Sequence, residues 1–180
     1  MSRPLIAILR GIERREAADV CAALIDAGID RIEVPLNSPD PFETIARMVE
    51  AHAHHALIGA GTVLSVNHVE KVHAAGGNLI VSPNCDQDVI AATKRLNMQS
   101  FPGVLTPTEC FNALKWDADG LKVFPAFQMG QDGLKALRAV LPVKTEVYMV
   151  GGVGPENIAE WLKAGANGFG LGSMLYKPGD

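Results

Sequence analysis

Lys122 stands in a short apolar stretch, Leu121–Val123, in which a cation alternates with two hydrophobic residues. Successive side chains of a strand point to opposite faces, so if Leu121 and Val123 pack against helices, Lys122 points into whatever the sheet encloses. Desolvation favours the neutral amine, and a neutral lysine amine is the nucleophile that forms Schiff bases with ketones. The alternative is a lysine at the end of a strand that extends into solvent.

Glu33 repeats this pattern between Ile32 and Val34. A lone buried glutamate is improbable, whereas a glutamate and a lysine that both point inward can compensate each other's charge. When a bond next to an imine is broken, protons must move between the hydroxyl, the carbinolamine and the enamine carbon, and a carboxyl group can carry them. The pair therefore predicts Schiff-base chemistry, with a purely structural ion pair as the alternative.

Polar residues also follow other apolar stretches, at positions where the strands of a parallel sheet end. Arg10 follows the first stretch, and an arginine there suits a carboxylate or phosphate, which its planar guanidinium binds through two hydrogen bonds. Thr62 follows 59–61, where glycines let a substrate approach the backbone and the hydroxyl can donate a hydrogen bond. A surface ion pair for Arg10 and ordinary loop geometry for 59–62 are the alternatives.

Glycine-rich segments end the last two apolar stretches. Gly151 and Gly152 follow one of them, and Gly172 and Ser173 follow the other. In parallel barrels the loops after the last two strands commonly bind a phosphate through their backbone amides. We therefore expect a phosphate cradle here, with a pair of tight turns as the alternative.

A repeated joint organises the chain between these residues. Gly28, Gly76 and Gly165 each close an amphipathic stretch and precede an apolar one, as a glycine does when it ends a helix before a strand. Their spacing fits units of about 22–24 residues, enough for a strand, a helix and two short loops. The pattern predicts strands near residues 4–9, 30–36, 56–61, 79–82, 98–101, 119–124, 146–150 and 168–172. It predicts helices near residues 14–27, 41–53, 66–75, 86–96, 107–115, 131–141 and 155–164.

Strict alternation of strands and helices predicts a parallel sheet, and eight strands favour closure into a (β/α)8 TIM barrel that forms one domain over residues 1–180. Only residues 173–180 follow the eighth strand, so we expect most of the final C-terminal helix to be lacking. The candidate residues would then meet at one end of the barrel, where the C-terminal ends of the strands carry the active site.

Composition excludes several classes of protein. The net charge is −4 and the 16 basic residues are scattered, so neither nucleic acid nor a membrane surface is an expected partner. The three cysteines lie far apart, and His68 and His73 are poorly spaced as ligands, so no metal site is predicted. The N-terminal apolar run is too short for a signal or a membrane span, which predicts a cytoplasmic protein.

Four segments resemble, in order and spacing, the class I aldolases of the KDPG/KDPGal group. These segments are Ile32–Asn37, Gly59–Leu64, Leu121–Ala126 and Gly151–Val153, within a resemblance that runs from residue 4 to residue 176. The resemblance implies cleavage of a phosphorylated 2-keto-3-deoxy sugar acid to pyruvate and a three-carbon aldehyde phosphate. It also implies a homotrimer that uses no metal and no organic cofactor.

The same resemblance implies that Lys122 forms the Schiff base and that Glu33 is the acid and base. Segments 5–11 and 35–39 are most similar to the galactonate-acting branch. The gluconate-acting branch has an arginine at the place of Asn37, so we expect Arg10 to bind the carboxylate instead. Departures from the galactonate enzymes at 104–107 and 127–129 bear on the sugar end of the substrate. The substrate-binding residues expected on these grounds are Arg10, Asn37, Thr62, Gly151, Gly152, Gly172 and Ser173.

Other functions stay open at this point. The main substrate could be the gluconate epimer or 4-hydroxy-2-oxoglutarate. A phosphosugar epimerase or isomerase on the same barrel would use Glu33 to deprotonate and Lys122 only to stabilise charge. A non-catalytic phosphosugar-binding protein is less favoured, because binding alone does not require an internal lysine and glutamate.

Overall fold

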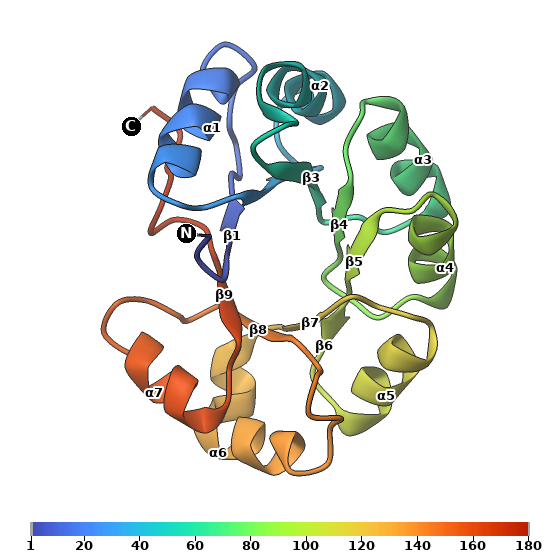
Figure 1. The fold of residues 1–180 in the computed structure, drawn as a ribbon, viewed down its shortest axis with the longest axis vertical. Coiled ribbons are helices and arrows are strands. Elements are labelled where there is room, and N and C mark those ends of the chain that lie inside the picture. The colour runs from blue at the N-terminus through green and yellow to red at the C-terminus, as the bar shows by residue number, and fades with distance from the viewer. Residues whose placement is uncertain (1, 180) are drawn as a thin grey trace.

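The computed structural model describes residues 2–179 as a ring of parallel strands surrounded by helices (Figure 1). Strands and helices alternate along the chain, as the repeated joints predict. The strands are β1 (Leu5–Ile8), β2 (Arg31–Pro35), β3 (Leu57–Gly61), β4 (Leu79–Val81), β5 (Gln99–Phe101), β6 (Gly103–Val104), β7 (Leu121–Val123), β8 (Val147–Val150) and β9 (Gly168–Leu171). The helices are α1 (Ala17–Asp26), α2 (Pro41–His52), α3 (Val66–Ala74), α4 (Gln87–Arg95), α5 (Pro107–Lys115), α6 (Ala126–Arg138) and α7 (Ile158–Ala164).

The sheet curls into a barrel whose fifth strand is broken in two. All paired strands are parallel, in the order β5-β4-β3-β2-β1-β9-β8-β7-β6. Only Pro102 separates β5, which pairs with β4, from β6, which pairs with β7. Proline has no N–H to donate, but the Pro102 carbonyl accepts a 2.9 Å hydrogen bond from the backbone N–H of Lys122. The predicted barrel is therefore confirmed, with its fifth strand reaching residue 104 instead of ending at 101.

Glycines at the predicted joints have the backbone conformation that ends a helix. The φ angles of Gly28, Gly76 and Gly165 are 83°, 84° and 106°, a region that glycine adopts without steric strain. Each of these residues follows a helix and precedes a strand, as predicted. These joints return the chain to the sheet, so the opposite ends of the strands can carry the functional loops.

The two faces of the sheet have different contents. On the outer face, hydrophobic strand residues such as Ile32, Val34, Leu121 and Val123 are fully buried in two clusters with residues of the helices. The inner face holds a smaller cluster of its own. Its buried members are Ile6, Leu79, Val81, Phe101 and Tyr148.

The last two helices differ from the prediction at their starts. Helix α6 begins at Ala126 instead of 131, and a kink at Gly130, with φ 69° and ψ 168°, interrupts it. Helix α7 begins at Ile158 instead of 155, because Pro155–Asn157 forms a turn. In both cases a loop that follows a strand sets where the helix starts.

Beyond β9, the described chain to Gly179 contains turns at 173–175 and 178–179 and no further helix. This agrees with the expectation that most of the final helix is lacking. Within residues 2–179, no helix combines the length and the apolar character needed to cross a membrane.

Candidate active site

Strand β7 carries Lys122 into the interior of the barrel. Leu121 and Val123 pack on the outer face, so the side chain between them points inward. Lys122 is only 7% exposed. Gly120, which shares the inner face with Lys122, lies against the ring of Phe101 inside the barrel. The structure agrees with the predicted inward orientation and not with a lysine that extends into solvent.

Strand β2 places Glu33 on the same inner face. The residue is 1% exposed, and its Oε2 atom has no hydrogen-bond partner among residues 2–179. Gly61, at the end of β3, makes room for the carboxylate, because a Cβ atom on that glycine would lie 1.8 Å from Oε2. An unpaired buried oxygen is costly in a protein interior, and such a group is available to a ligand or to a proton.

Burial and mutual charge set the protonation of the two groups. Burial raises the pKa of Glu33 to about 7, although the charges of Lys122 and Arg10 act in the opposite direction. Burial lowers the pKa of the Lys122 amine, while the Glu33 carboxylate raises it and Arg10 lowers it further. Lys122 and Glu33 do not form a direct ion pair among the described residues, so they act on each other through space. The site therefore holds a lysine shifted toward its neutral form and a carboxyl that exchanges its proton near neutral pH.

The ring of Phe124 lies over the Lys122 amine, and this contact was not predicted from the sequence. The Lys122 Nζ atom lies 5.1 Å from the centroid of the Phe124 ring, within the range of a cation–π contact. Phe124 is two residues beyond Lys122 within the predicted strand 119–124, so alternation places both on one face without specifying the ring contact. The ring is 40% exposed and also lines the hollow described below.

Arg10 and Asn37 meet at the rim, after β1 and β2. The exposed Arg10 guanidinium donates a hydrogen bond to the Asn37 side-chain oxygen. Next to this pair, the backbone N–H of Gly11 donates to the hydroxyl of the buried Ser38 at 2.9 Å. The two loops are thus joined, and Arg10 is held beside the mouth of the barrel. Ser38 was missed, because an isolated serine in a loop carries no signal of its own.

Thr62 lies where β3 ends and has an unusual backbone. Its φ angle is 57°, a left-handed conformation that β-branched residues rarely adopt. Backbone strain of this kind tends to cluster at ligand-binding sites. The residue is half-buried and next to Gly61, which faces the Glu33 carboxylate. Its predicted place at the rim therefore agrees with the structure.

A hollow of about 230 Å³ brings the predicted phosphate residues together at the mouth of the barrel. Gly151 and Gly152 line it with φ angles of 90° and 75°, so their N–H groups belong to a loop that a side chain would strain. The lining combines both glycine-rich rims with the Arg10 loop and Phe124. Its residues are Ile8, Arg10, Phe124, Val150, Gly151, Gly152, Val153, Gly170, Gly172, Ser173 and Met174.

Asn157 holds the first of these rims in shape. Its side-chain Nδ2 donates to the Gly152 carbonyl at 2.9 Å, and its Oδ1 accepts from the Gly154 N–H at 3.1 Å. The sequence pattern predicts that a helix starts at 155 and gives no sign of this role for Asn157. The side chain instead closes the glycine loop on itself before α7 begins.

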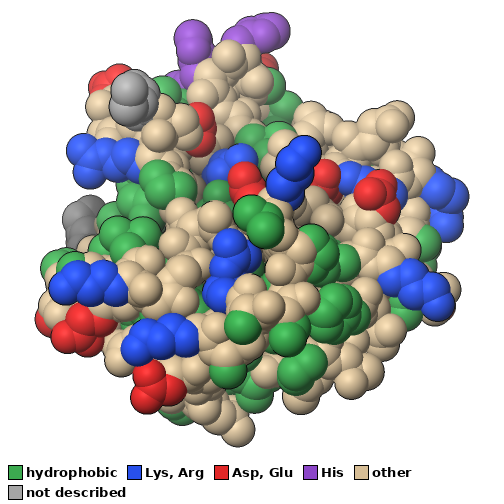
Figure 2. Space-filling view, turned by 60° about the horizontal axis from the view of Figure 1, so that its bottom comes forward, with side chains coloured by type: hydrophobic (Ala, Val, Ile, Leu, Met, Phe, Trp, Pro, Cys, Tyr) green, Lys and Arg blue, Asp and Glu red, His purple; other side chains and the backbone are tan. Residues whose placement is uncertain are grey.

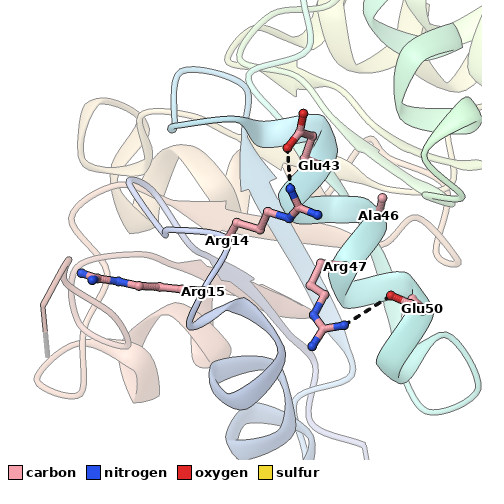
Figure 3. Close-up of a pocket in the computed structure, with 6 residues that line it drawn as sticks. All are labelled: Arg14, Arg15, Glu43, Ala46, Arg47 and Glu50. Atoms are coloured by element: carbon pink, nitrogen blue, oxygen red, sulfur yellow. Dashed lines mark hydrogen bonds and ion pairs between the residues drawn. The ribbon is translucent and has the colours of Figure 1, made fainter.

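A larger surface hollow, of about 720 Å³, lies elsewhere, between the loop before α1 and helix α2 (Figure 3). Its charged side chains are largely paired with one another: Arg14 contacts Glu43 at 2.8 Å and Arg47 contacts Glu50 at 3.4 Å. These ion pairs are exposed, and exposed ion pairs contribute little to the stability of a fold. The smaller hollow is instead lined by Phe124, whose ring contacts Lys122, and by Arg10, whose charge acts on both Lys122 and Glu33. We therefore assign the chemistry to the smaller hollow.

Among residues 2–179, no group of three or more His, Cys, Asp or Glu side chains is arranged to hold a metal ion. The polar groups at the mouth of the barrel are instead a lysine, a glutamate, an arginine and glycine-rich loops. This set suits an anionic substrate with a carbonyl group that the lysine can attack.

Comparisons with known proteins point to one family. The family model for KDPG and KHG aldolases matches residues 1–179. A probable 2-dehydro-3-deoxy-6-phosphogalactonate aldolase of Rhizobium meliloti (strain 1021) is 50% identical over 99% of this chain and 84% of its own length. The 2-dehydro-3-deoxy-6-phosphogalactonate aldolase of Escherichia coli (strain K12) is 49% identical over 98% of this chain and 86% of its own. A solved structure named native KDPGal is 48% identical and covers 100% of this chain and 87% of its own, with a TM-score of 0.97.

Proposed function

This chain belongs to the KDPG and KHG aldolase family and is therefore an aldolase, and we propose that it cleaves 2-dehydro-3-deoxy-6-phosphogalactonate to pyruvate and glyceraldehyde 3-phosphate. The observation that carries the proposal is that Lys122 and Glu33 both project into the barrel, buried and without a direct ion pair. Such a lysine suits Schiff-base formation, and such a carboxyl suits proton transfer.

The reaction begins when the Lys122 amine adds to the C2 ketone, and loss of water gives an iminium ion. The Glu33 carboxylate then accepts the proton of the C4 hydroxyl as the C3–C4 bond breaks. The electrons of that bond move into the iminium to form an enamine, and glyceraldehyde 3-phosphate leaves. C3 of the enamine takes the proton back from Glu33, and water hydrolyses the resulting iminium to release pyruvate and Lys122.

The rest of the site would hold the two ends of the substrate. Gly151, Gly152, Gly172 and Ser173 line one hollow and offer backbone amides and a hydroxyl to the phosphate. Thr62 lies at the end of β3, beside the glycine that faces Glu33, where the pyruvyl end would sit. Arg10 lines the hollow and is joined to Asn37, so this pair would bind the substrate carboxylate.

The galactonate epimer is favoured over the gluconate epimer on two grounds. Both relatives at 49–50% identity carry the galactonate name. Asn37, which differs from the arginine of the gluconate-acting branch, makes its hydrogen bond to Arg10 at the rim. We expect turnover of the galactonate epimer to equal or exceed that of the gluconate epimer when both are assayed side by side. A strong preference for the gluconate epimer or for 4-hydroxy-2-oxoglutarate would overturn this substrate assignment.

The Schiff base has a direct test. Incubation with pyruvate and borohydride should attach one reduced pyruvyl group per chain, located at Lys122 by peptide mapping, because borohydride traps only an imine. Lys122→Met should abolish both labelling and cleavage. The exposed Lys163 offers a matched control, and Lys163→Met should keep both. Label on another lysine, or cleavage by Lys122→Met, would reject Lys122 as the Schiff-base residue. No label on any lysine would instead support an epimerase or isomerase.

The assembly proposed for this barrel is a cytoplasmic homotrimer of one domain per chain. An apolar groove between α5 and α6 supports self-association: Leu105, Met129, Leu137 and Val140 line it, and Val140 is 59% exposed. In Figure 2 the molecule is turned so that the bottom of Figure 1 comes forward, and hydrophobic side chains are gathered on the face seen there. Light scattering should give about three times the 19.1 kDa of one chain, and Val140→Asp should lower that mass. A monomer in the unsubstituted protein would contradict the trimer.

A further inference from the structure

Two aromatic rings fill the barrel beneath the candidate active site. Phe101 of β5 and Tyr148 of β8 are 1% and 2% exposed and belong to the inner cluster. Their ring centroids lie 5.3 Å apart and their planes meet at 86°, which is an edge-to-face arrangement. We call this pair the aromatic floor.

Glycines on the strands of the site allow the aromatic floor to lie close beneath it. A Cβ atom on Gly120 would lie 2.5 Å from the Phe101 ring, and one on Gly168 would lie 2.4 Å from the Tyr148 ring. Gly120 precedes Lys122 by two residues and so shares its face of the strand. Tyr148 is also the register partner of Lys122 in the pairing of β7 with β8. The floor therefore directly adjoins the strand segment that presents the lysine.

Arg31 fastens the floor to the strand that carries the glutamate. Arg31 precedes Glu33 by two residues on β2, and its guanidinium donates a hydrogen bond to the Tyr148 hydroxyl. Its Cζ atom lies 6.0 Å from the Phe101 ring centroid and 5.8 Å from that of Tyr148. The Tyr148 hydroxyl in turn donates to Glu146 at 3.3 Å. These hydrogen bonds thus link β2 to β8, the strand that pairs with β7.

Arg31 reaches the surface at the end of the barrel where the strands begin. There Arg31 lines a surface hollow of about 390 Å³ together with Asp30, His54 and Gln99, well removed from the rim residues. Arg31, which lines this hollow, contacts both rings, and Phe101 and Tyr148 in turn adjoin the strand segment of Lys122. Burial is the first cause of the pKa shifts of Lys122 and Glu33, so bulk water admitted beneath them would weaken both shifts.

We propose that Tyr148 and Arg31 are positioning residues of this aldolase: together they lock the aromatic floor that holds Lys122 and Glu33 in place and shields them from water. This inference rests on the proposed function. Neither residue touches the substrate; each acts through the lysine and the glutamate. Burial raises the pKa of Tyr148 to about 12, so its hydroxyl keeps its proton and its hydrogen bond to Glu146 at any working pH.

The test is Tyr148→Phe, which keeps the ring and removes the hydroxyl. With water admitted to the floor, the pKa of Lys122 should rise toward its ordinary value. The pH at which pyruvate and borohydride trap the lysine at half-maximal rate should move up by about one unit, and kcat near pH 7 should fall about tenfold with little change in KM. The charged groups that act on Lys122, Glu33 and Arg10, are left in place.

Arg31→Met should reproduce both effects, and Arg31→Lys should restore part of them by returning a cation over the rings. The matched control is Tyr176→Phe, since that hydroxyl likewise donates to a glutamate, Glu16, but lies outside the barrel interior. It should leave the trapping profile and kcat unchanged. Labelling of Lys122 in the unsubstituted protein tests the proposed function separately. If Tyr148→Phe lowers only the melting temperature while its trapping profile and kcat match the control, the positioning role is refuted.

Discussion

Burial gives the Glu33 carboxyl a property that an exposed glutamate lacks. With its pKa raised to about 7, it is present in both protonation states near neutral pH. The proposed reaction needs both states, because the same group accepts a proton from the C4 hydroxyl and later returns one to C3. The unpaired Oε2 atom, opposite Gly61, is the position from which that exchange would occur.

Glu33→Gln separates the two halves of the reaction. The amide cannot accept the hydroxyl proton, so C–C cleavage should slow by roughly a hundredfold or more, while borohydride trapping of pyruvate on Lys122 should persist. In the unsubstituted protein, kcat/KM should fall as the pH drops below about 7, where Glu33 takes up its proton. Glu70→Gln, at an exposed position of α3, is the matched control. Cleavage by Glu33→Gln at near-normal rates would remove Glu33 from the mechanism.

The inward directions of these two side chains were predictable from alternation alone. Ile32 and Val34, like Leu121 and Val123, are hydrophobic neighbours that fix which face of each strand is covered by helices. Alternation also puts Phe124 on the face of Lys122, but it does not predict that the ring lies over the amine. The ring also lies next to Gly151, where an added Cβ atom would be 3.5 Å from it, and this proximity joins segments far apart in sequence.

At the scale of elements, local sequence signals predict where helices end and strands begin, but they do not predict the conformation of the functional loops. Gly28, Gly76 and Gly165 end helices by a conformation that depends on glycine itself, so the period of the fold follows from them. The start of α6 depends instead on a tertiary contact, because the Phe127 N–H donates to the Gly151 carbonyl and holds the first turn against the phosphate loop. A sequence pattern that restarts after the kink at Gly130 therefore places the helix five residues too late.

Gly152, which also lies next to Phe127, allows a test of the phosphate cradle. A Cβ atom there would lie 3.2 Å from the Cβ of Phe127, so Gly152→Val should crowd the rim and raise KM for the phosphorylated substrate about tenfold or more. Gly130→Val is the control, since Gly130 also has a positive φ but has no atom within 4 Å of an added Cβ. Both variants should lose stability through backbone strain, and only Gly152→Val should change KM. An unchanged KM would place the phosphate elsewhere.

At the scale of the whole molecule, the closed barrel makes the site possible, but burying the site lowers the stability of the folded protein. Glu33 is buried inside the barrel, and no group in the described part of the chain forms a hydrogen bond to its Oε2 atom, so the fold bears the cost of burying an ionisable group. Proteins commonly retain such a cost at functional sites. The closure of the sheet through the broken strand at Pro102 is equally a property of the whole, because β5 and β6 pair with neighbours on opposite sides.

This cost should appear in the pH dependence of stability. Between pH 4.5 and about 7, the folded protein keeps a proton on Glu33 that the unfolded chain has released, so the free energy of unfolding should fall as the pH rises. The shift corresponds to up to about 3 kcal/mol once the pH exceeds 7. Glu33→Gln keeps the size of the side chain and removes its titration. Urea unfolding of both proteins from pH 5 to pH 8 should therefore show Glu33→Gln gaining stability relative to the unsubstituted protein as the pH rises. Two parallel curves would mean that folding leaves the pKa of Glu33 at its ordinary value, and that the carboxyl is hydrated inside the barrel.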